Sequence, residues 1–270
     1  MASRMLFSSK KSMASGSGKA KVTRYINTGY GDTEAVTVNP TEKHQATIVW
    51  LHDLNGTGYE ASDFVKSFSL YNVKWICPNA PSISDMGFYG EPARAWFKVN
   101  GLSTSGPLDP YEIDDLKNAT AYVARLLKNE PEHVMKGVAG YGIGGALVLH
   151  IATCCALGSF PIKIRAVVGI NCWLPNRFKL EDQMNSTTGA TSRAAELPIL
   201  ITHGYNDKMV PFGTGGLSSD ILFKVGFIRR KLKIIHMCDH AINFQVMTDV
   251  SLWLTKKFEL EGEPDEDPAV

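Results

Sequence analysis

The chain has 270 residues, of which 44% are hydrophobic and 20% are charged, and its formal net charge is +1. This length is enough for one sizeable hydrophobic core, and a single α/β domain often reaches it. The near-zero net charge gives no global field that would point to nucleic acid or to a membrane surface as a partner. No apolar run approaches the ~18 residues of a spanning helix, so we expect no membrane span.

The two ends of the chain differ in composition from the middle. Residues 1–22 are rich in Ser, Gly and Lys and are interpreted as a disordered arm, and residues 259–270 as an acidic tail. Residues 23–258 are expected to form one domain. The five cysteines are irregularly spaced without a C-x-x-C pair. This favours reduced thiols in a cytoplasmic protein.

Within the predicted domain, strand signals alternate with helix signals. In chain order we predict strands at 46–51 and 73–77, a helix at 114–128, a strand at 137–141, a helix at 146–157, strands at 164–170 and 198–202, a helix at 218–225, a strand at 232–237 and a helix at 244–258. This alternation indicates an α/β protein with a mainly parallel sheet and helices on both faces. In such sheets, sites form beyond the carboxyl ends of the strands.

The segment 137–146 has the form of a nucleophile elbow, with an apolar strand, a tight glycine turn and the start of a helix. The elbow pattern G-x-S-x-G places a serine on the sharp turn. Here the five residues from Gly140 to Gly144 read Gly-Tyr-Gly-Ile-Gly, so Gly142 stands at the serine position. Because glycine has no side chain, this turn cannot form an acyl-enzyme intermediate.

Two further loops supply candidates for an acid and a base. Asp207 follows the strand predicted at 198–202, and His240 follows the strand predicted at 232–237. Elbow, acid and histidine occur in the order that α/β-hydrolases use. We therefore predict that Asp207 orients His240 as a catalytic pair. The alternative is that Asp207 caps a turn and His240 lies in a surface loop.

The loop after the first predicted strand, His52-Asp53-Leu54-Asn55-Gly56-Thr57-Gly58, lies where an oxyanion site is built. We expect its donors to be the backbone N–H groups of Leu54 and Ile143, the second at the start of the elbow helix. These are backbone groups, so the loss of a serine side chain does not remove them.

With these motifs, the chain resembles a known family, the plant branch of the acyl-protein thioesterases and carboxylesterases, close to lysophospholipase-like esterases. The matching segments run from about residue 40 to 258: 44–52, 73–78, 95–97, 173–175, 198–200, His203-Gly204, Asp207 with Val210-Pro211, 249–250 and 253–254. The resemblance implies an α/β-hydrolase fold. It also places Asp207 and His240 at the acid and histidine positions of the family.

Four motif loops depart from the family pattern. The elbow G-F-S-x-G has lost its serine, and the loop H-G-L-G-D-x-G carries Asp53 and Asn55 in place of two glycines. The segment G-L-G-H-Y reads Met-Cys-Asp-His-Ala around His240, and S-G-W-L-P begins with Asn171. Because four loops differ from the family pattern together, we interpret Gly142 as a natural residue and not as an introduced substitution. We also interpret the pocket as one that has lost its hydrolase function and changed its lining.

Three functions remain open. The first is non-hydrolytic acid–base catalysis of isomerase, lyase or cyclase type in specialised metabolism, in which His240 and Asp207 act in space freed by the missing serine. Asp53 would be a second acid/base group or an anchor for a cationic amine; the alternative is a solvated loop carboxylate. The second function is a binding protein or receptor. The third is weak ester or thioester hydrolysis, with His240 activating water.

Other residues receive structural or lining roles. Asp53, Asn55, Trp96 and Trp173 are the expected substrate-binding residues, with the two tryptophans walling either the pocket or the core. His52, His150 and His203 are expected to be structural. No metal-ligand spacing, dinucleotide loop or phosphate loop is present, so we expect a small-molecule partner without cofactor or metal. Segments 82–92 and 100–110 are expected to shape the pocket, and a homodimer, common among the resembled proteins, remains an open expectation.

Overall fold

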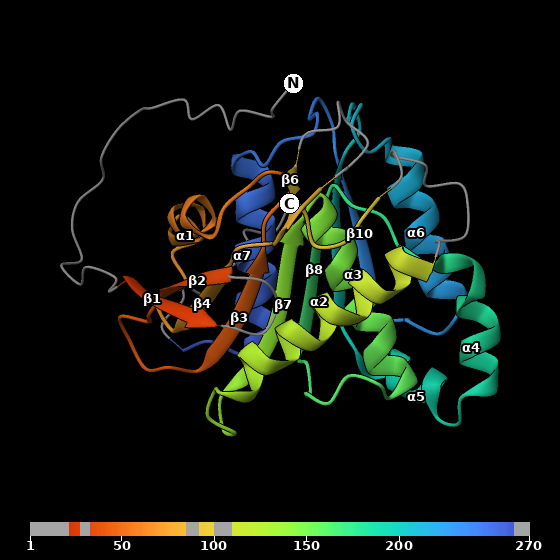
Figure 1. Cartoon of the computed structure of the whole chain (residues 1–270), viewed down its shortest axis with the longest axis horizontal. Coiled ribbons are helices and arrows are strands. Elements are labelled where there is room, and N and C mark those ends of the chain that lie inside the picture. The colour runs from red at the N-terminus through yellow and green to blue at the C-terminus, as the bar shows by residue number, and fades with distance from the viewer. Residues whose placement is uncertain (1–21, 28–32, 85–91, 100–109, 262–270) are drawn as a thin grey trace, which may run out of the picture.

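In the computed structural model, residues 22–27, 33–84, 92–99 and 110–261 are described. The described part contains a central eight-stranded sheet in the order β1-β2-β4-β3-β7-β8-β9-β10 (Figure 1). Its strands are β1 (Val22–Asn27), β2 (Thr33–Val38), β3 (Ala46–Leu51), β4 (Val73–Pro78), β7 (Met135–Tyr141), β8 (Ala166–Ile170), β9 (Ile199–Gly204) and β10 (Arg230–Ile235). Strands β1 and β2 are antiparallel to their neighbours, and the pairs from β4 to β10 are parallel.

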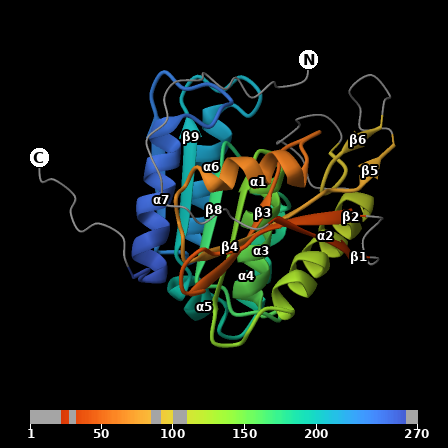
Figure 2. The same cartoon turned by 90° about the vertical axis from the view of Figure 1, so that its left-hand side faces the viewer.

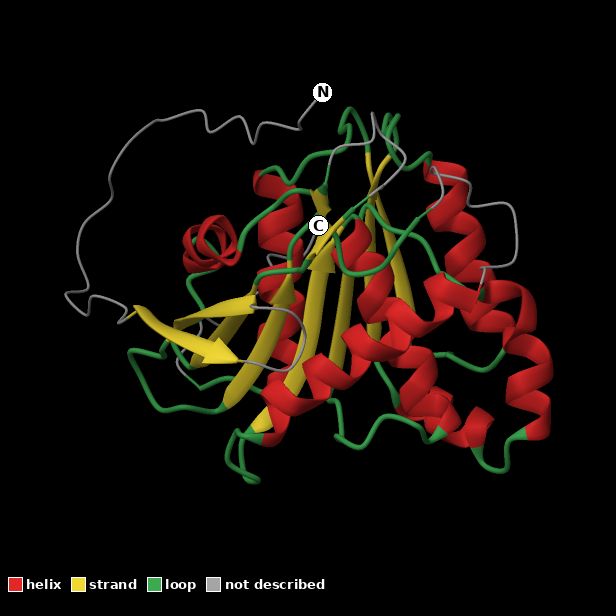
Figure 3. Cartoon of the chain, in the orientation of Figure 1, coloured by secondary structure: helices red, strands yellow, loops and turns green. Residues whose placement is uncertain are grey.

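Helices cover both faces of this sheet (Figures 2 and 3). They are α1 (Gly58–Lys66), α2 (Pro110–Lys128), α3 (Ile143–Leu157), α4 (Leu180–Ser186), α5 (Ala190–Glu196), α6 (Phe212–Lys224) and α7 (Phe244–Phe258), with a short 3₁₀ turn at Arg177–Lys179. A small hairpin pairs β5 (Ser82–Ile83) with β6 (Ala93–Arg94). No helix in the described ranges is both long and apolar enough to cross a membrane.

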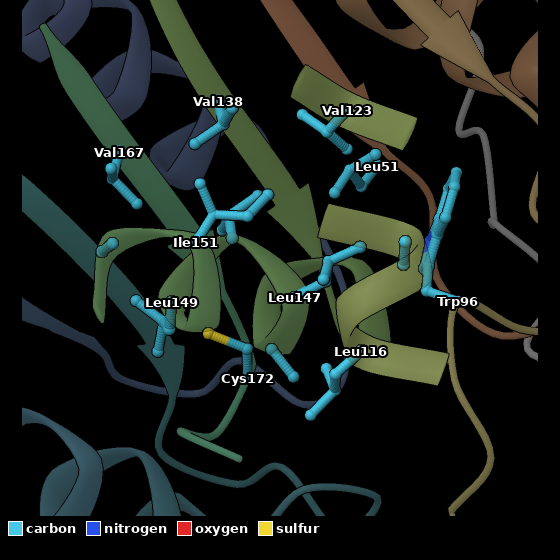
Figure 4. Packing of buried hydrophobic residues seen from close by; sticks show 14 of the residues in the cluster. Leu51, Trp96, Leu116, Val123, Val138, Leu147, Leu149, Ile151, Val167 and Cys172 are labelled. Carbon is cyan, nitrogen blue, oxygen red and sulfur yellow. The ribbon is translucent and has the colours of Figure 1, made fainter. Parts of the chain in front are cut away.

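The core is divided by the sheet into two apolar clusters. One cluster packs α2, α3 and α6 against one face, with side chains such as Leu116, Leu147 and Leu222 (Figure 4 shows the first two). The other packs α1 and α7 against the opposite face, through residues such as Phe64 and Val250. Helix α3 is buried along most of its length, which explains its almost wholly apolar sequence.

The expected α/β fold with a mainly parallel sheet and helices on both faces is confirmed. The strand at 46–51 and the helix at 244–258 have the expected bounds, and the other expected elements are present with shifted ends. The last strand was expected at 232–237 but ends at Ile235. Its continuation is broken where Met237 adopts a positive φ of 52°, which extended strands do not allow.

Several elements were not expected from the sequence. They are β1, β2, the hairpin of β5 and β6, and the helices α1, α4 and α5. Most of these are short, and α1 starts at Gly58 directly after a glycine-containing loop, although its buried residues Ala61, Phe64 and Val65 recur at helical spacing. Residues 85–91 and 100–109, which belong to the segments expected to shape the pocket, lie outside the described residues, as do 1–21 and 262–270.

Candidate active site

The elbow between β7 and α3 has the sharp turn that its sequence suggested. Gly142 has φ 57° and ψ −120°, a backbone conformation that residues other than glycine adopt only under strain. An ideal Cβ at Gly144 would overlap with the backbone carbonyl of Leu51, so this glycine permits α3 to approach the end of β3. The turn therefore keeps the strained geometry of a nucleophile elbow without a nucleophile on it.

Asp207 and His240 are brought together by the loops after β9 and β10. His240 Nδ1 donates a hydrogen bond of 2.7 Å to Asp207 Oδ2. The other oxygen, Asp207 Oδ1, accepts the backbone N–H groups of Met209 at 2.8 Å and Val210 at 2.9 Å. The Asp207 side chain is fully buried, so its charge is balanced by these donors and by the imidazole. This arrangement fixes the orientation of His240.

Asp53 occupies the place that a serine side chain would take. An ideal Cβ built on Gly142 would overlap with the Asp53 carboxylate. Asp53 Oδ1 accepts the backbone N–H of Ile143 at 3.0 Å, and Asp53 Oδ2 lies 3.1 Å from His240 Nε2. The carboxylate therefore sits where a nucleophile would stand, bonded to both the histidine and the expected oxyanion donor.

This position corrects one expectation drawn from the sequence. The missing serine was expected to leave free space above the imidazole and an open oxyanion donor at Ile143. Both are filled by Asp53, which reaches in from the loop after β3. The interpretation of Asp53 as a solvated loop carboxylate is also wrong, because its side chain is only 20% exposed and makes two hydrogen bonds to the site.

The two carboxylates set the charge of His240. Burial lowers the pKa of this imidazole, but the hydrogen bonds that it donates to Asp207 and Asp53, together with the charges of these carboxylates, outweigh burial and raise the pKa to about 9. At neutral pH, His240 is therefore an imidazolium that donates from Nδ1 to Asp207 and from Nε2 to Asp53. The site contains a cation held between two anions, whereas a serine hydrolase needs a neutral histidine beside its hydroxyl.

His52 holds the Asp53 loop in place. Burial lowers the pKa of His52 to about 4, so the ring is neutral. Its Nδ1 donates to the Asp53 carbonyl at 2.6 Å, and its Nε2 accepts the Ala80 N–H at 2.9 Å. The Gly56 N–H donates to the same Asp53 carbonyl at 2.9 Å. The backbone of Asp53 is thus fixed, which directs its side chain toward Gly142.

Tyr141 and Asn171 brace the loop that carries His240, and sequence reasoning gave neither a role. The Tyr141 hydroxyl donates to the His240 carbonyl at 2.8 Å, and its ring stacks on the imidazole with centroids 4.9 Å apart. Asn171 Nδ2 donates to the Asp239 carbonyl at 3.2 Å, while its Oδ1 accepts the Gly204 N–H at 2.9 Å. The sequence does hold a signal for both residues, because each lies in a motif loop that departs from the family pattern.

The remaining expected site residues make contacts of other kinds. Asn55 accepts the Arg94 N–H through its side chain at 3.1 Å and donates its own N–H to the Arg94 carbonyl, which ties the loop to β6. Leu54 is half-buried against the core. Trp96 is fully buried and donates to the His52 carbonyl at 2.8 Å, so it belongs to the core and not to a pocket wall (Figure 4). Trp173 is buried beside Phe97.

The expected structural histidines do bond to backbone or to neighbours. His203 Nε2 lies 2.8 Å from the Val210 carbonyl, and His150 Nε2 lies 3.5 Å from Cys154 Sγ. The thiols of Cys172 and Cys238 are buried, and burial raises the pKa of both. Neither thiol is therefore a ready thiolate.

A parallel sheet covered on both faces, an elbow from β7 to α3, and an acid and a histidine after β9 and β10 together define an α/β-hydrolase. Residues 32–258 match the model of the phospholipase/carboxylesterase family. The chain belongs to this family of α/β-hydrolases.

Individual relatives agree with this assignment. Acyl-protein thioesterase 1 of Cryptococcus neoformans is 30% identical over 68% of this chain and 76% of that protein. The crystal structure of Zea mays acyl-protein thioesterase 2 is similar with a TM-score of 0.77 and 33% identity, covering 83% of this chain and 98% of that one. The crystal structure of Arabidopsis thaliana SOBER1, at 23% identity and a TM-score of 0.65, covers 79% of this chain and 99% of that one and shares the fold.

Proposed function

We propose that this protein is an acid–base enzyme acting on a small molecule, in a reaction of isomerase, lyase or cyclase type that forms no acyl-serine. The observation that carries the proposal is the contact of Asp53 Oδ2 with His240 Nε2 at 3.1 Å, at the place of the absent serine. A carboxylate and an imidazolium side by side supply a base and an acid in one site.

The three side chains have distinct roles in this proposal. Asp53 is the partly exposed member and takes a proton from the substrate, while the imidazolium of His240 stabilises or protonates the negative charge that develops. Asp207, buried and held by two backbone N–H groups, acts as a positioning residue through Nδ1 of His240. Tyr141 and Asn171 donate hydrogen bonds to the backbone of the His240 loop and so hold His240 next to Asp53.

Ester or thioester hydrolysis is a poorer fit to these contacts. An acyl transition state needs the Ile143 N–H for its oxyanion, but Asp53 Oδ1 already accepts this donor. The negative charge of Asp53 also opposes a second negative charge at the same point. A binding protein or receptor, for its part, has no need of an imidazolium held between two carboxylates and braced from two sides.

Exchange of carbon-bound hydrogen for solvent deuterium tests the proposal without knowledge of the natural substrate. Acetylacetone and ethyl acetoacetate are suitable probes, because their C–H groups are acidic enough for a carboxylate base, and NMR follows the loss of signal. The wild type is expected to accelerate the exchange. Asp53→Asn and His240→Ala should each lose on the order of 10²-fold or more of this acceleration.

A matched control is available on helix α1. Asp63 is exposed and pairs only with Lys66 of the same helix among the described contacts, so Asp63→Asn makes the same chemical change away from the site. This variant should exchange the probes at the wild-type rate. If the wild type exchanged them no faster than Asp53→Asn, the proposed acid–base function would be wrong.

A further inference from the structure

We infer that Asp53 is also a nucleophile, and that the site opens small epoxides through a covalent ester between the Asp53 carboxylate and a substrate carbon. This activity goes beyond the proposed function, because proton transfer alone forms no covalent bond between the enzyme and its substrate. It rests on the same side chains as the proposed function, but different experiments would contradict the two proposals.

The contacts of Asp53 carry the inference. Its carboxylate takes the volume that a nucleophilic side chain on Gly142 would fill, with Oδ1 on the Ile143 N–H and Oδ2 beside His240 Nε2. Carboxylates act as covalent nucleophiles in several classes of enzyme. Asp53 is 20% exposed, whereas the side chain of Asp207 is fully buried, so of these two carboxylates only Asp53 is open to a substrate.

In the first step, Asp53 Oδ2 attacks a carbon of the epoxide ring and forms a C–O bond, while the bond from that carbon to the ring oxygen breaks. The ring oxygen takes the proton from Nε2 of the His240 imidazolium and becomes a hydroxyl group. The products are a hydroxyalkyl ester of Asp53 and a neutral His240. No external acid is needed, because His240 carries the proton at the start.

In the second step, neutral His240 takes a proton from water and the hydroxide adds to Cγ of Asp53. Negative charge then develops on Oδ1, which already accepts the Ile143 N–H. The intermediate collapses by breaking the bond from Cγ to Oδ2, and the leaving alkoxide takes the proton from His240. The product is a diol, and the new Asp53 carboxyl group returns its proton to His240, which restores the starting state.

The same contacts favour an epoxide over an ester or a thioester as the electrophile. An epoxide keeps its leaving oxygen attached, and that oxygen needs only a proton, which Nε2 supplies beside the attacking carboxylate. An ester or thioester would instead require an oxyanion donor during the attack, and the Ile143 N–H is held by the nucleophile itself. The donor becomes useful only in the second step, when Oδ1 is the atom that gains charge.

The test uses the full chain with propylene oxide and styrene oxide in water enriched in ¹⁸O. With enzyme in excess over epoxide, a single turnover should place ¹⁸O in the peptide that contains Asp53, as seen by mass spectrometry, and leave the diol unlabelled. With epoxide in excess, later turnovers should label the diol. Asp53→Asn should consume these epoxides at least ~10²-fold more slowly, and Asp63→Asn should behave as the wild type.

Two outcomes would overturn the inference, and they differ in what they say about the proposed function. If ¹⁸O entered the diol in the first turnover and Asp53 stayed unlabelled, water would be the nucleophile and Asp53 only its base, so the acid–base proposal would stand. If neither epoxide were consumed faster by the wild type than by Asp53→Asn, the covalent activity would be excluded. The proposed function would then rest on the deuterium exchange alone.

Discussion

His240 Nε2 lies 3.1 Å from Asp53 Oδ2, on the opposite edge of the imidazole from Asp207, whose Oδ2 lies 2.7 Å from Nδ1. One ring therefore bridges two carboxylates that come from loops far apart in the sequence. A serine hydrolase places a neutral hydroxyl at the Nε2 edge. With a carboxylate in place of that hydroxyl, the histidine changes its role. A neutral imidazole acts as a base, whereas this imidazolium already holds a proton and acts as an acid.

The protonation state of His240 gives the first prediction. Its pKa is raised from 6.5 to about 9 against the opposing effect of burial, because Asp207 and Asp53 both stabilise the cation. The Asp53→Asn variant loses one of these charges, so its His240 pKa should fall from about 9 toward 6.5. The ring ¹⁵N shifts of His240 during a pH titration measure this value. An unchanged pKa in the variant would mean that Asp53 does not pair with the ring.

The same shift predicts how stability depends on pH. A histidine whose pKa is raised in the folded state stabilises that state fully below its unfolded pKa of 6.5, and the contribution is lost as pH rises through about 9. A rise of this size corresponds to about 3 kcal/mol. Urea unfolding between pH 6 and pH 9.5 should therefore show a loss of stability in the wild type. Asp53→Asn should lose less over the same range, and equal slopes would contradict the pairing.

The braces of the His240 loop give a third prediction. Tyr141→Phe removes the 2.8 Å hydrogen bond to the His240 carbonyl and should lower the free energy of unfolding by about 1 kcal/mol. Tyr71→Phe, at an exposed tyrosine, is the matched control and should be neutral within about 0.5 kcal/mol.

Asn171→Ala tests the second brace. It leaves the buried Gly204 N–H without its side-chain acceptor and should cost about 1–3 kcal/mol. Deuterium exchange of the acetylacetone probe should also slow in this variant, because the Asp239 and Ala241 carbonyls beside His240 lose their donor. Full stability together with full exchange activity would show that Asn171 does not position the loop.

Much of the fold could be predicted from the sequence, because hydrophobic periodicity is local. The strand at 46–51 and the helix at 244–258 needed no tertiary information. The proximity of Asp207 and His240 also followed, since parallel strands bring their carboxyl ends to one edge of the sheet. The position of Asp53 could not be predicted. It depends on the bonds of His52 to Asp53 and Ala80, and on the absence of a Cβ at Gly142.

The place of Asp53 also changes what restoring the serine should do. With Asp53 present, Gly142→Ser alone should gain little esterase activity, because the new side chain overlaps with the carboxylate and the Ile143 N–H stays occupied. Asp53→Gly alone removes the carboxylate but supplies no nucleophile. Only Gly142→Ser combined with Asp53→Gly provides a hydroxyl, a free oxyanion donor and a histidine no longer paired with Asp53.

Whether Asp53 takes the place of the serine can be decided by measuring hydrolysis of a short-chain p-nitrophenyl ester by the wild type, both single variants and the double variant. We predict that the double variant exceeds Gly142→Ser by on the order of 10²-fold, the usual effect of one oxyanion donor, and exceeds the two forms that lack a serine nucleophile by at least as much. If Gly142→Ser alone were as active as the double variant, Asp53 would not occupy the serine's place. A wild type as active as the double variant would contradict the account altogether.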